Sequence, residues 1–222
     1  MTAAMLIDND VIIKLAAFKL GSQLEIAIAR IDVQPATMLG VGKFVVRDRL
    51  VRADWLTDRA SVLAALEDFL TILAFVEPTN AELETAAEFE RTALQLNLEL
   101  DGGESQLLAI LLNRNYKVLL TGDKRAILAI ASIAPNQAQG KLACFEQILL
   151  DIAIRANIDD VRTNVCREPK VDRAAYVSFS CFSSSKTDLA TIAIGLESYI
   201  RDIKNKANDI LLKSADLSAL AS

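Results

Sequence analysis

Acidic residues follow apolar stretches at two distant places in the chain. Asp8 and Asp10 stand in the stretch "MLIDNDVII", and Asp123 closes the stretch "VLLTGD", directly before Lys124 and Arg125. Both apolar stretches are typical of buried strands, so each group of acids stands where a strand ends. In an open parallel sheet the carboxyl ends of the strands share one edge, and ligands bind there. The sequence therefore predicts a site at which carboxylates from distant segments converge.

Glu104 is the third acid of this predicted site. It stands near the start of the predicted helix that precedes the Asp123 strand, so its side chain can point at the same edge. Three converging carboxylates repel one another and lose hydration, which is unfavourable without a cation. Oxygen ligands suit Mg²⁺ or Mn²⁺, and such an ion can activate a water and stabilise charge that develops on a phosphate. We therefore predict that Asp8, Glu104 and Asp123 are catalytic and bind the metal, with Asp10 as a further ligand.

These residues also have simpler interpretations. Taken singly, Glu104 or Asp123 could be a helix N-cap or a favourable charge in a first helical turn. Lys124 and Arg125 could face solvent in the first turn of the next helix rather than contact a phosphate. The three acids together favour a site, because capping does not require all of them to fall on one edge of a sheet.

The residue types that are missing exclude other chemistries. The 222 residues contain no histidine, so serine–histidine and cysteine–histidine pairs, histidine zinc sites and histidine general bases are ruled out. Cys144, Cys166 and Cys181 lack C-x-x-C spacing, and the N-terminus lacks a secretory pattern. We therefore expect a cytoplasmic protein with reduced cysteines. No apolar run reaches the roughly 18 residues that a membrane-spanning helix needs, so no membrane partner is expected.

The charge of the chain limits how it could bind nucleic acid. A net charge of −5 argues against a uniformly basic binding surface, although it allows a local basic patch. One local enrichment of basic residues comprises Lys43, Arg47, Arg49, Arg52 and Arg59. It is either such a patch or the solvated face of a helix, and the helix face is the simpler interpretation.

Strands that alternate with helices must position the acids. Short apolar runs predict strands at residues 5–8, within "IDVQPATML", within "LAFVEP", at 117–121 and within "KLACF". Helical periodicity predicts helices at residues 11–20, 23–29, 61–73, 81–96, 104–113, 124–132 and 147–156, and Pro35 is expected to begin another. This alternation predicts an α/β fold, a three-layer α/β/α sandwich with a central parallel sheet.

The pattern changes beyond the last of these helices. Residues 161–172 are polar and irregular, "AAYVSFSCF" alternates like a strand, and "SSSK" is typical of a linker. Residues 189–212 then predict a long amphipathic helix, whose apolar stripe would pack on the domain or on a second copy. We therefore divide the chain into an α/β domain at 1–155 and a mainly helical extension at 156–222.

Three segments together resemble the PIN domain, the fold of metal-dependent ribonucleases that includes many toxins of bacterial toxin–antitoxin pairs. These are "LIDNDVIIKLA", "LDGGESQLLAILL" and "VLLTGDKRAI", in this order and spacing. The resemblance implies that Asp8 is the family's first metal-binding acid, Glu104 its mid-chain acid and Asp123 the acid after the fourth strand. Asp10 matches a neighbouring polar position, and Thr121 matches a hydroxyl residue two places before the final acid.

The sequence departs from this family pattern at one acid. PIN nucleases usually carry another acid on the helix after the second strand, but here "PATMLGVGKFVV" places Gly40 or Gly42 there. Asp10 or Asp101 could substitute, the site could bind one metal weakly, or it could be inactive. A glutamate introduced at either glycine is expected to strengthen Mn²⁺ binding if the site is a reduced nuclease centre.

Three functions follow from this reading. The first is a metal-dependent ribonuclease that cleaves RNA phosphodiester bonds, with Thr121, Lys124 and Arg125 in contact with the substrate. The second is a binding module that kept the fold without catalysis and recognises RNA or a protein partner such as an antitoxin. The third is an interaction protein or homo-oligomer subunit, which the acidic composition and the C-terminal helix would suit.

Overall fold

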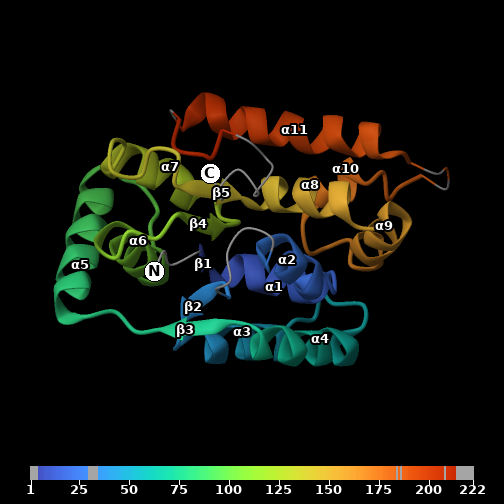
Figure 1. Ribbon diagram of the computed structural model, residues 1–222, viewed down its shortest axis with the longest axis horizontal. Coiled ribbons are helices and arrows are strands. Elements are labelled where there is room, and N and C mark those ends of the chain that lie inside the picture. Colours follow the sequence, from blue (N-terminus) through green and yellow to red (C-terminus); the bar gives the residue numbers. More distant parts are fainter. Residues whose placement is uncertain (1–4, 30–34, 184, 186, 208, 214–222) are drawn as a thin grey trace.

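A five-stranded parallel sheet forms the centre of the molecule (Figure 1). The structure is a computed structural model, and it describes residues 5–29, 35–183, 185, 187–207 and 209–213. In sequence order the strands are β1 (Met5–Ile7), β2 (Thr37–Leu39), β3 (Ala74–Val76), β4 (Val118–Thr121) and β5 (Leu142–Cys144). Every pairing is parallel, in the order β3-β2-β1-β4-β5. This confirms the predicted three-layer α/β/α fold.

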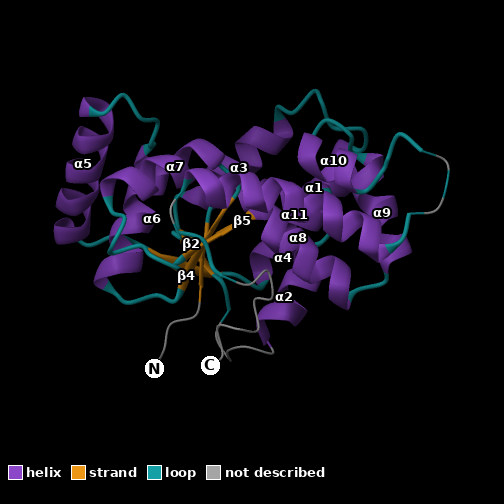
Figure 2. Cartoon of the chain, turned by 90° about the horizontal axis from the view of Figure 1, so that it is seen from above, coloured by secondary structure: helices purple, strands orange, loops and turns teal. Residues whose placement is uncertain are grey.

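Helices cover both faces of the sheet (Figure 2). The helices before β4 are α1 (Asn9–Ala17), α2 (Gly21–Ala29), α3 (Gly42–Val51), α4 (Arg59–Thr71), α5 (Asn80–Gln95) and α6 (Gly102–Asn113). Those after it are α7 (Lys124–Ile133), α8 (Phe145–Arg155), α9 (Ile158–Arg167), α10 (Arg173–Ser178) and α11 (Leu189–Lys206). Helices α5, α6 and α7 lie on one side of the sheet, and α1, α2, α4 and α8 lie on the other.

The strand order reverses next to β1. The chain first builds outward from β1 to β2 and β3, then returns and adds β4 and β5 on the other side of β1. The connections leave β1 and β4 in opposite directions, so a crevice forms at the carboxyl ends of these two strands. Asp8 directly follows β1, and Asp123 follows β4 after Gly122. The topology thus brings two of the predicted acids to one crevice.

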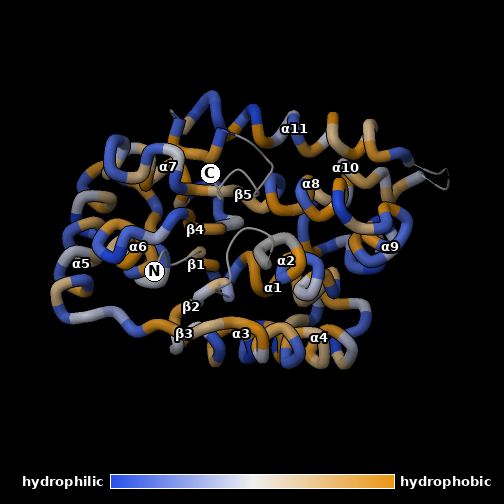
Figure 3. The backbone as a smooth tube through the Cα atoms, viewed as in Figure 1, coloured by the Kyte–Doolittle hydropathy of each residue, from blue (hydrophilic) through white to orange (hydrophobic). Residues whose placement is uncertain are grey.

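One hydrophobic core includes the sheet and the C-terminal region. The strands are mostly apolar, as their hydropathy in Figure 3 shows, and most of their residues are buried. The same buried cluster continues from Leu119 on β4 to Ile192 and Leu196 on α11. Helix α11 packs mainly on α8 and α10 and also contacts α7. The region that was predicted as an extension therefore shares its core with the α/β domain.

The chain after α11 covers the edge of the sheet beside β5. Leu142 on β5 donates its N–H to Ile210 and accepts a hydrogen bond from the N–H of Leu212. Leu142 and Leu211 form a parallel bridge. The predicted helix at 189–212 was therefore too long, because its last residues leave the helix at Ala207 and satisfy the exposed backbone groups of an edge strand instead.

The predictions around Pro35 and beyond residue 156 need three corrections. Pro35 does not begin a helix but precedes strand β2, whose parallel pairing with β1 and β3 outweighs the local helix signal. The brief strand that was expected before Pro35 lies outside the described residues. Residues 161–172, expected to be irregular, include most of α9, which Asn157 caps. The expected strand in "AAYVSFSCF" is helix α10, which Asp172 caps. Both helices are short, and side-chain caps decide where they begin.

The expectation of reduced cysteines is also wrong for one pair. Cys166 at the end of α9 and Cys181 after α10 form a disulfide, with their Cα atoms 5.2 Å apart. Cys144 is free and buried. Within the described ranges, no helix is long and apolar enough to cross a membrane.

Two isoleucines on α11 test whether the C-terminal region belongs to the core. Ile192 is 0% exposed and Ile194 is 69% exposed. We expect Ile192→Ala to lower the free energy of unfolding by about 2–5 kcal/mol, because it removes buried methylene groups and leaves a cavity. Ile194→Ala on the same helix should change it by less than about 0.5 kcal/mol. Urea denaturation followed by circular dichroism measures both, and equal effects would contradict a shared core.

Candidate functional site

A cleft of about 890 Å³ opens at the carboxyl ends of β1 and β4. Six of the residues predicted for the site line it: Asp8, Asp10, Glu104, Asp123, Lys124 and Arg125. Thr121 does not line the cleft and is 1% exposed. Its hydroxyl lies 3.4 Å from Asp8 Oδ2, to which it donates, and accepts a hydrogen bond from the N–H of Asp123. Thr121 therefore holds two of the acids in place from below the cleft.

Asp8 is the N-cap of α1 and is nearly buried. Its Oδ1 accepts a hydrogen bond of 2.7 Å from the N–H of Asn9. Burial raises the pKa of Asp8 to about 7, and repulsion by Asp10 adds to the shift. A carboxylate so placed is unfavourable in its charged form at neutral pH unless a cation lies beside it.

Glu104 belongs to a capping box at the start of α6. The Asp101 side chain accepts hydrogen bonds from the N–H groups of Gly103 and Glu104, and Glu104 Oε2 accepts one of 2.9 Å from the N–H of Asp101. Burial raises the pKa of Glu104 to about 8, and the charges of Asp101, Asp8 and Asp123 add to the increase. Glu104 thus caps its helix and also faces the other acids of the cleft.

Asp123 caps α7 and forms an ion pair with Arg125. Its Oδ1 accepts hydrogen bonds from the N–H groups of Arg125 and Ala126, and its Oδ2 lies 3.0 Å from the Arg125 guanidinium. Burial alone would raise the pKa of Asp123, but the bonds from Arg125 outweigh it and lower the pKa. Asp123 is therefore stable as a carboxylate at neutral pH, whereas burial makes the charged forms of Asp8 and Glu104 unfavourable.

Asp10 is neutralised by Lys14, one turn further along α1. Lys14 Nζ lies 2.7 Å from Asp10 and 3.0 Å from Asp172, the N-cap of α10. Burial lowers the pKa of Lys14, but the two carboxylates outweigh burial and raise it. Gly122 makes this pair possible, since a Cβ there would lie 2.2 Å from Asp10 Oδ2. Asp10 is therefore an ion-pair partner of Lys14, and as a metal ligand it would have to share or lose this pair.

The predicted substrate-binding cations also have partners within the protein. Lys124 Nζ lies 2.7 Å from Glu146 and 4.9 Å from the centroid of the Tyr199 ring. Arg125 pairs with Glu99 at 2.6 Å as well as with Asp123. Each reaches the cleft only at its rim, and a phosphate would have to share them with these acids.

Sequence reasoning missed some residues that line the cleft. Asp172 caps α10 and Arg173 begins it, in a region predicted to be irregular or extended, so neither was expected at the cleft. Asn9 also lines the cleft and lies between two acids that had been predicted. Arg49 of α3 lines it as well, although the sequence placed Arg49 only in a basic enrichment. The N-cap pattern of Asp172 is the local signal that could have found Asp172 and Arg173.

A side chain at either of the two glycines expected to replace the family acid would have to displace the end of a neighbouring side chain. A Cβ at Gly42 would lie 2.4 Å from Asn9 Oδ1 and 2.8 Å from Met38 Cε. A Cβ at Gly40 would lie 2.1 Å from Glu77 Oε1. A glutamate at residue 42 would require the ends of the Asn9 and Met38 side chains to shift, and stronger Mn²⁺ binding by either glutamate variant stays a prediction.

The donor set suits a divalent cation in its chemistry. The carboxylate oxygens of Asp8 and Glu104 are the ligands that Mg²⁺ and Mn²⁺ prefer, and burial makes their charge unfavourable without a cation. The present side-chain positions do not form a closed shell, since no group of three acidic or cysteine side chains in the described part of the chain is arranged to hold a metal ion. Asp8 and Glu104 are the residues that would hold such an ion, with Asp123 at the rim.

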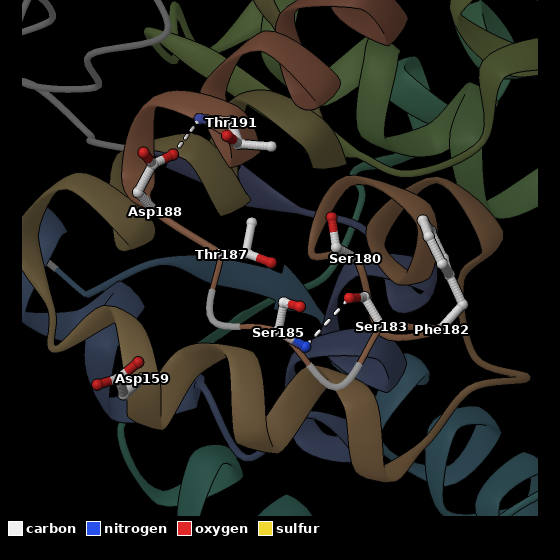
Figure 4. Close-up of a pocket in the computed structure, with 8 residues that line it drawn as sticks. All are labelled: Asp159, Ser180, Phe182, Ser183, Ser185, Thr187, Asp188 and Thr191. Atoms are coloured by element: carbon white, nitrogen blue, oxygen red, sulfur yellow. Dashed lines mark hydrogen bonds between the residues drawn. The ribbon is translucent and has the colours of Figure 1, made fainter.

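A second cavity, of about 520 Å³, lies in the C-terminal region (Figure 4). Hydroxyl side chains from residues 180–191 surround it, together with Asp159, Asp188 and Phe182. Ser183 accepts a hydrogen bond from the N–H of Ser185, and Asp188 caps α11 through the N–H of Thr191. Several of its polar groups are thus used by a turn and a cap, and it holds none of the predicted site residues.

Comparisons with known proteins assign no relative to the chain. The sequence matches no protein-family model and no curated protein, and the structure matches no solved structure.

The raised pKa values predict how one acid affects stability. Between about pH 4 and pH 8 the folded protein holds protons on Asp8 and Glu104 that the unfolded chain has released, so the free energy of unfolding falls as pH rises through this window. Asp8→Asn removes this carboxyl group, so it should raise the free energy of unfolding by roughly 1–4 kcal/mol at pH 8 in metal-free buffer. The gain should vanish near pH 4.

Chemical denaturation at several pH values measures this effect. Asp54→Asn, at an exposed position, is the matched control and should leave the pH dependence unchanged. Asn retains one oxygen, which can accept the bond from the N–H of Asn9, and its NH₂ group can donate to the Thr121 hydroxyl, so lost capping does not mask the result. A loss of stability at pH 8 in Asp8→Asn would contradict the electrostatic account.

Proposed function

We propose that this protein is a PIN-like, divalent-metal-dependent ribonuclease that hydrolyses RNA phosphodiester bonds. The observation that carries the proposal is the position of Asp8, Glu104 and Asp123 around one cleft, at the crevice where the strand order of a parallel sheet reverses. The ordered motifs around these acids, which resemble those of PIN nucleases, support the same assignment. RNA is the partner of a nuclease of this type.

The acids and arginines of the cleft have separate roles in this proposal. Asp8 and Glu104 hold the metal ion, and a bound Mg²⁺ or Mn²⁺ supplies Lewis-acid stabilisation and activation of water. Asp123 remains an anion at the rim, where it orients the Arg125 guanidinium. Arg49 and Arg173 are exposed on the same cleft and make no ion pair with any described residue, so they are available to a phosphate.

One observation favours the alternative of a binding module without catalysis. Lys14 neutralises Asp10, and the described acids do not form a ready-made metal shell. A cleft with this arrangement could bind RNA, or a protein such as an antitoxin, without cleaving anything. Cleavage and metal binding must therefore be measured separately.

Labelled single-stranded RNA incubated with the purified protein tests catalysis. We expect cleavage with Mn²⁺ or Mg²⁺ and none with EDTA, because the water and the phosphate need the ion. Asp8→Asn and Glu104→Gln should each lower the cleavage rate by about 100-fold or more, a loss of about 2.7 kcal/mol of transition-state stabilisation. Asp202→Asn, at an exposed position on α11, is the control and should cleave like the wild type.

Thermal unfolding with and without Mn²⁺ reports metal binding independently of activity. Mn²⁺ should raise the melting temperature of the wild type and of Asp202→Asn but not that of Asp8→Asn. RNA binding without cleavage or a Mn²⁺ effect would favour the binding module. Cleavage that persists in EDTA, or in both acid variants, would contradict the proposed nuclease.

A further inference from the structure

Two exposed phenylalanines flank one lysine beside the cleft. Phe44 on α3 is 61% exposed and Phe75 on the edge strand β3 is 47% exposed. Lys43 Nζ lies 4.9 Å from the centroid of the Phe44 ring and 5.4 Å from that of Phe75. The two rings come from elements about 30 residues apart in sequence, and the same ammonium group brings them together.

This aromatic pair is continuous with the cleft. Val41, Val45 and Arg49 line the cleft and are exposed, and their spacing of four residues places them along one face of α3. Phe44 is three residues from Val41, so its ring borders the same face. An exposed surface thus runs from the acids at the ends of β1 and β4, across α3, to Phe44 and Phe75.

The charges on this surface favour a polyanion. Arg47 pairs with Glu67, and Arg52 pairs with Asp48 at 2.7 Å. Lys43 and Arg49, by contrast, make no ion pair among the residues that the structure describes. In a chain with a net charge of −5, these two cations lie where the exposed rings and the cleft meet. A purely apolar partner would not need them, whereas a nucleic acid offers both phosphates and ring faces.

We propose that Phe44, Phe75 and Lys43 form a base-stacking site for single-stranded RNA, whose backbone continues past Arg49 into the acidic cleft. Unpaired bases stack on the two rings, and Lys43 contacts a phosphate between them. A duplex hides the faces of its bases, so the site selects an unpaired strand. The role of the strand as substrate rests on the proposed nuclease function, but its binding at this site does not.

Fluorescence anisotropy with a labelled RNA oligonucleotide in EDTA measures binding without cleavage. The double variant Phe44→Ala/Phe75→Ala should raise Kd by about 10-fold or more for the single strand. A duplex of the same sequence should bind more weakly and respond little to the double variant. Phe182→Ala is the matched control, since Phe182 is 70% exposed but lies at the second cavity. It should bind like the wild type.

The salt dependence of Kd separates stacking from phosphate contact. Lys43→Ala should reduce the slope of log K against log salt by about 0.7, the share of one phosphate on a single strand. The double phenylalanine variant should weaken binding with little change in that slope. Circular dichroism should show that every variant is folded, because all three side chains are at least partly exposed.

Several outcomes would overturn this site. An unchanged Kd in the double variant, or a wild type that binds no RNA, would remove it. A wild-type dimer that dissociates on Phe44→Ala/Phe75→Ala in light scattering, with RNA affinity unchanged, would make the surface an interface between copies of the chain. The proposed function fails separately: if the wild type does not cleave but the phenylalanines still affect Kd, the binding site stands without the nuclease.

Discussion

The crowding of carboxylates at the ends of β1 and β4 is the constraint on which the rest of the structure depends. Asp8, Glu104 and Asp123 each stand at the start of a helix, where backbone N–H groups and the helix dipole partly compensate their charge. The capping interpretation and the site interpretation are therefore not alternatives here. Capping is what allows three acids to share one cleft before any cation is bound.

Lys14 supplies the fixed positive charge that joins the two parts of the chain. It lies on α1, pairs with Asp10 on the same helix and with Asp172 at the start of α10, and its ammonium packs 5.0 Å from the Phe145 ring centroid. A buried cation with two carboxylate partners is costly to separate from either of them. The C-terminal region is thus anchored at the cleft itself as well as through the shared core.

The sequence predicted the features that depend on local pattern. Short apolar runs gave all the strands except β2 near their observed positions, and acids at the ends of β1 and β4 gave most of the acidic cleft. Strand β2 was misplaced because "PATMLGVGK" has no clear period and its strand forms through pairing on both sides. Helices α9 and α10 begin at the local caps Asn157 and Asp172, which the prediction overlooked. The pairing of Cys166 with Cys181 and the position of Arg173 at the cleft depend on tertiary contacts that no local pattern encodes.

The charges of the cleft are arranged by depth. Its lining includes six acids, Asp8, Asp10, Asp101, Glu104, Asp123 and Asp172, and five bases, Lys14, Arg49, Lys124, Arg125 and Arg173. Asp8 and Glu104 are buried at its floor, whereas Arg49, Arg125 and Arg173 are exposed at its rim. Asp8 and Glu104 attract a divalent ion and the exposed arginines attract a phosphate, so the ion and the phosphate would be bound at different depths of the cleft. The exposed arginines therefore allow an acidic protein to admit a polyanion at this cleft.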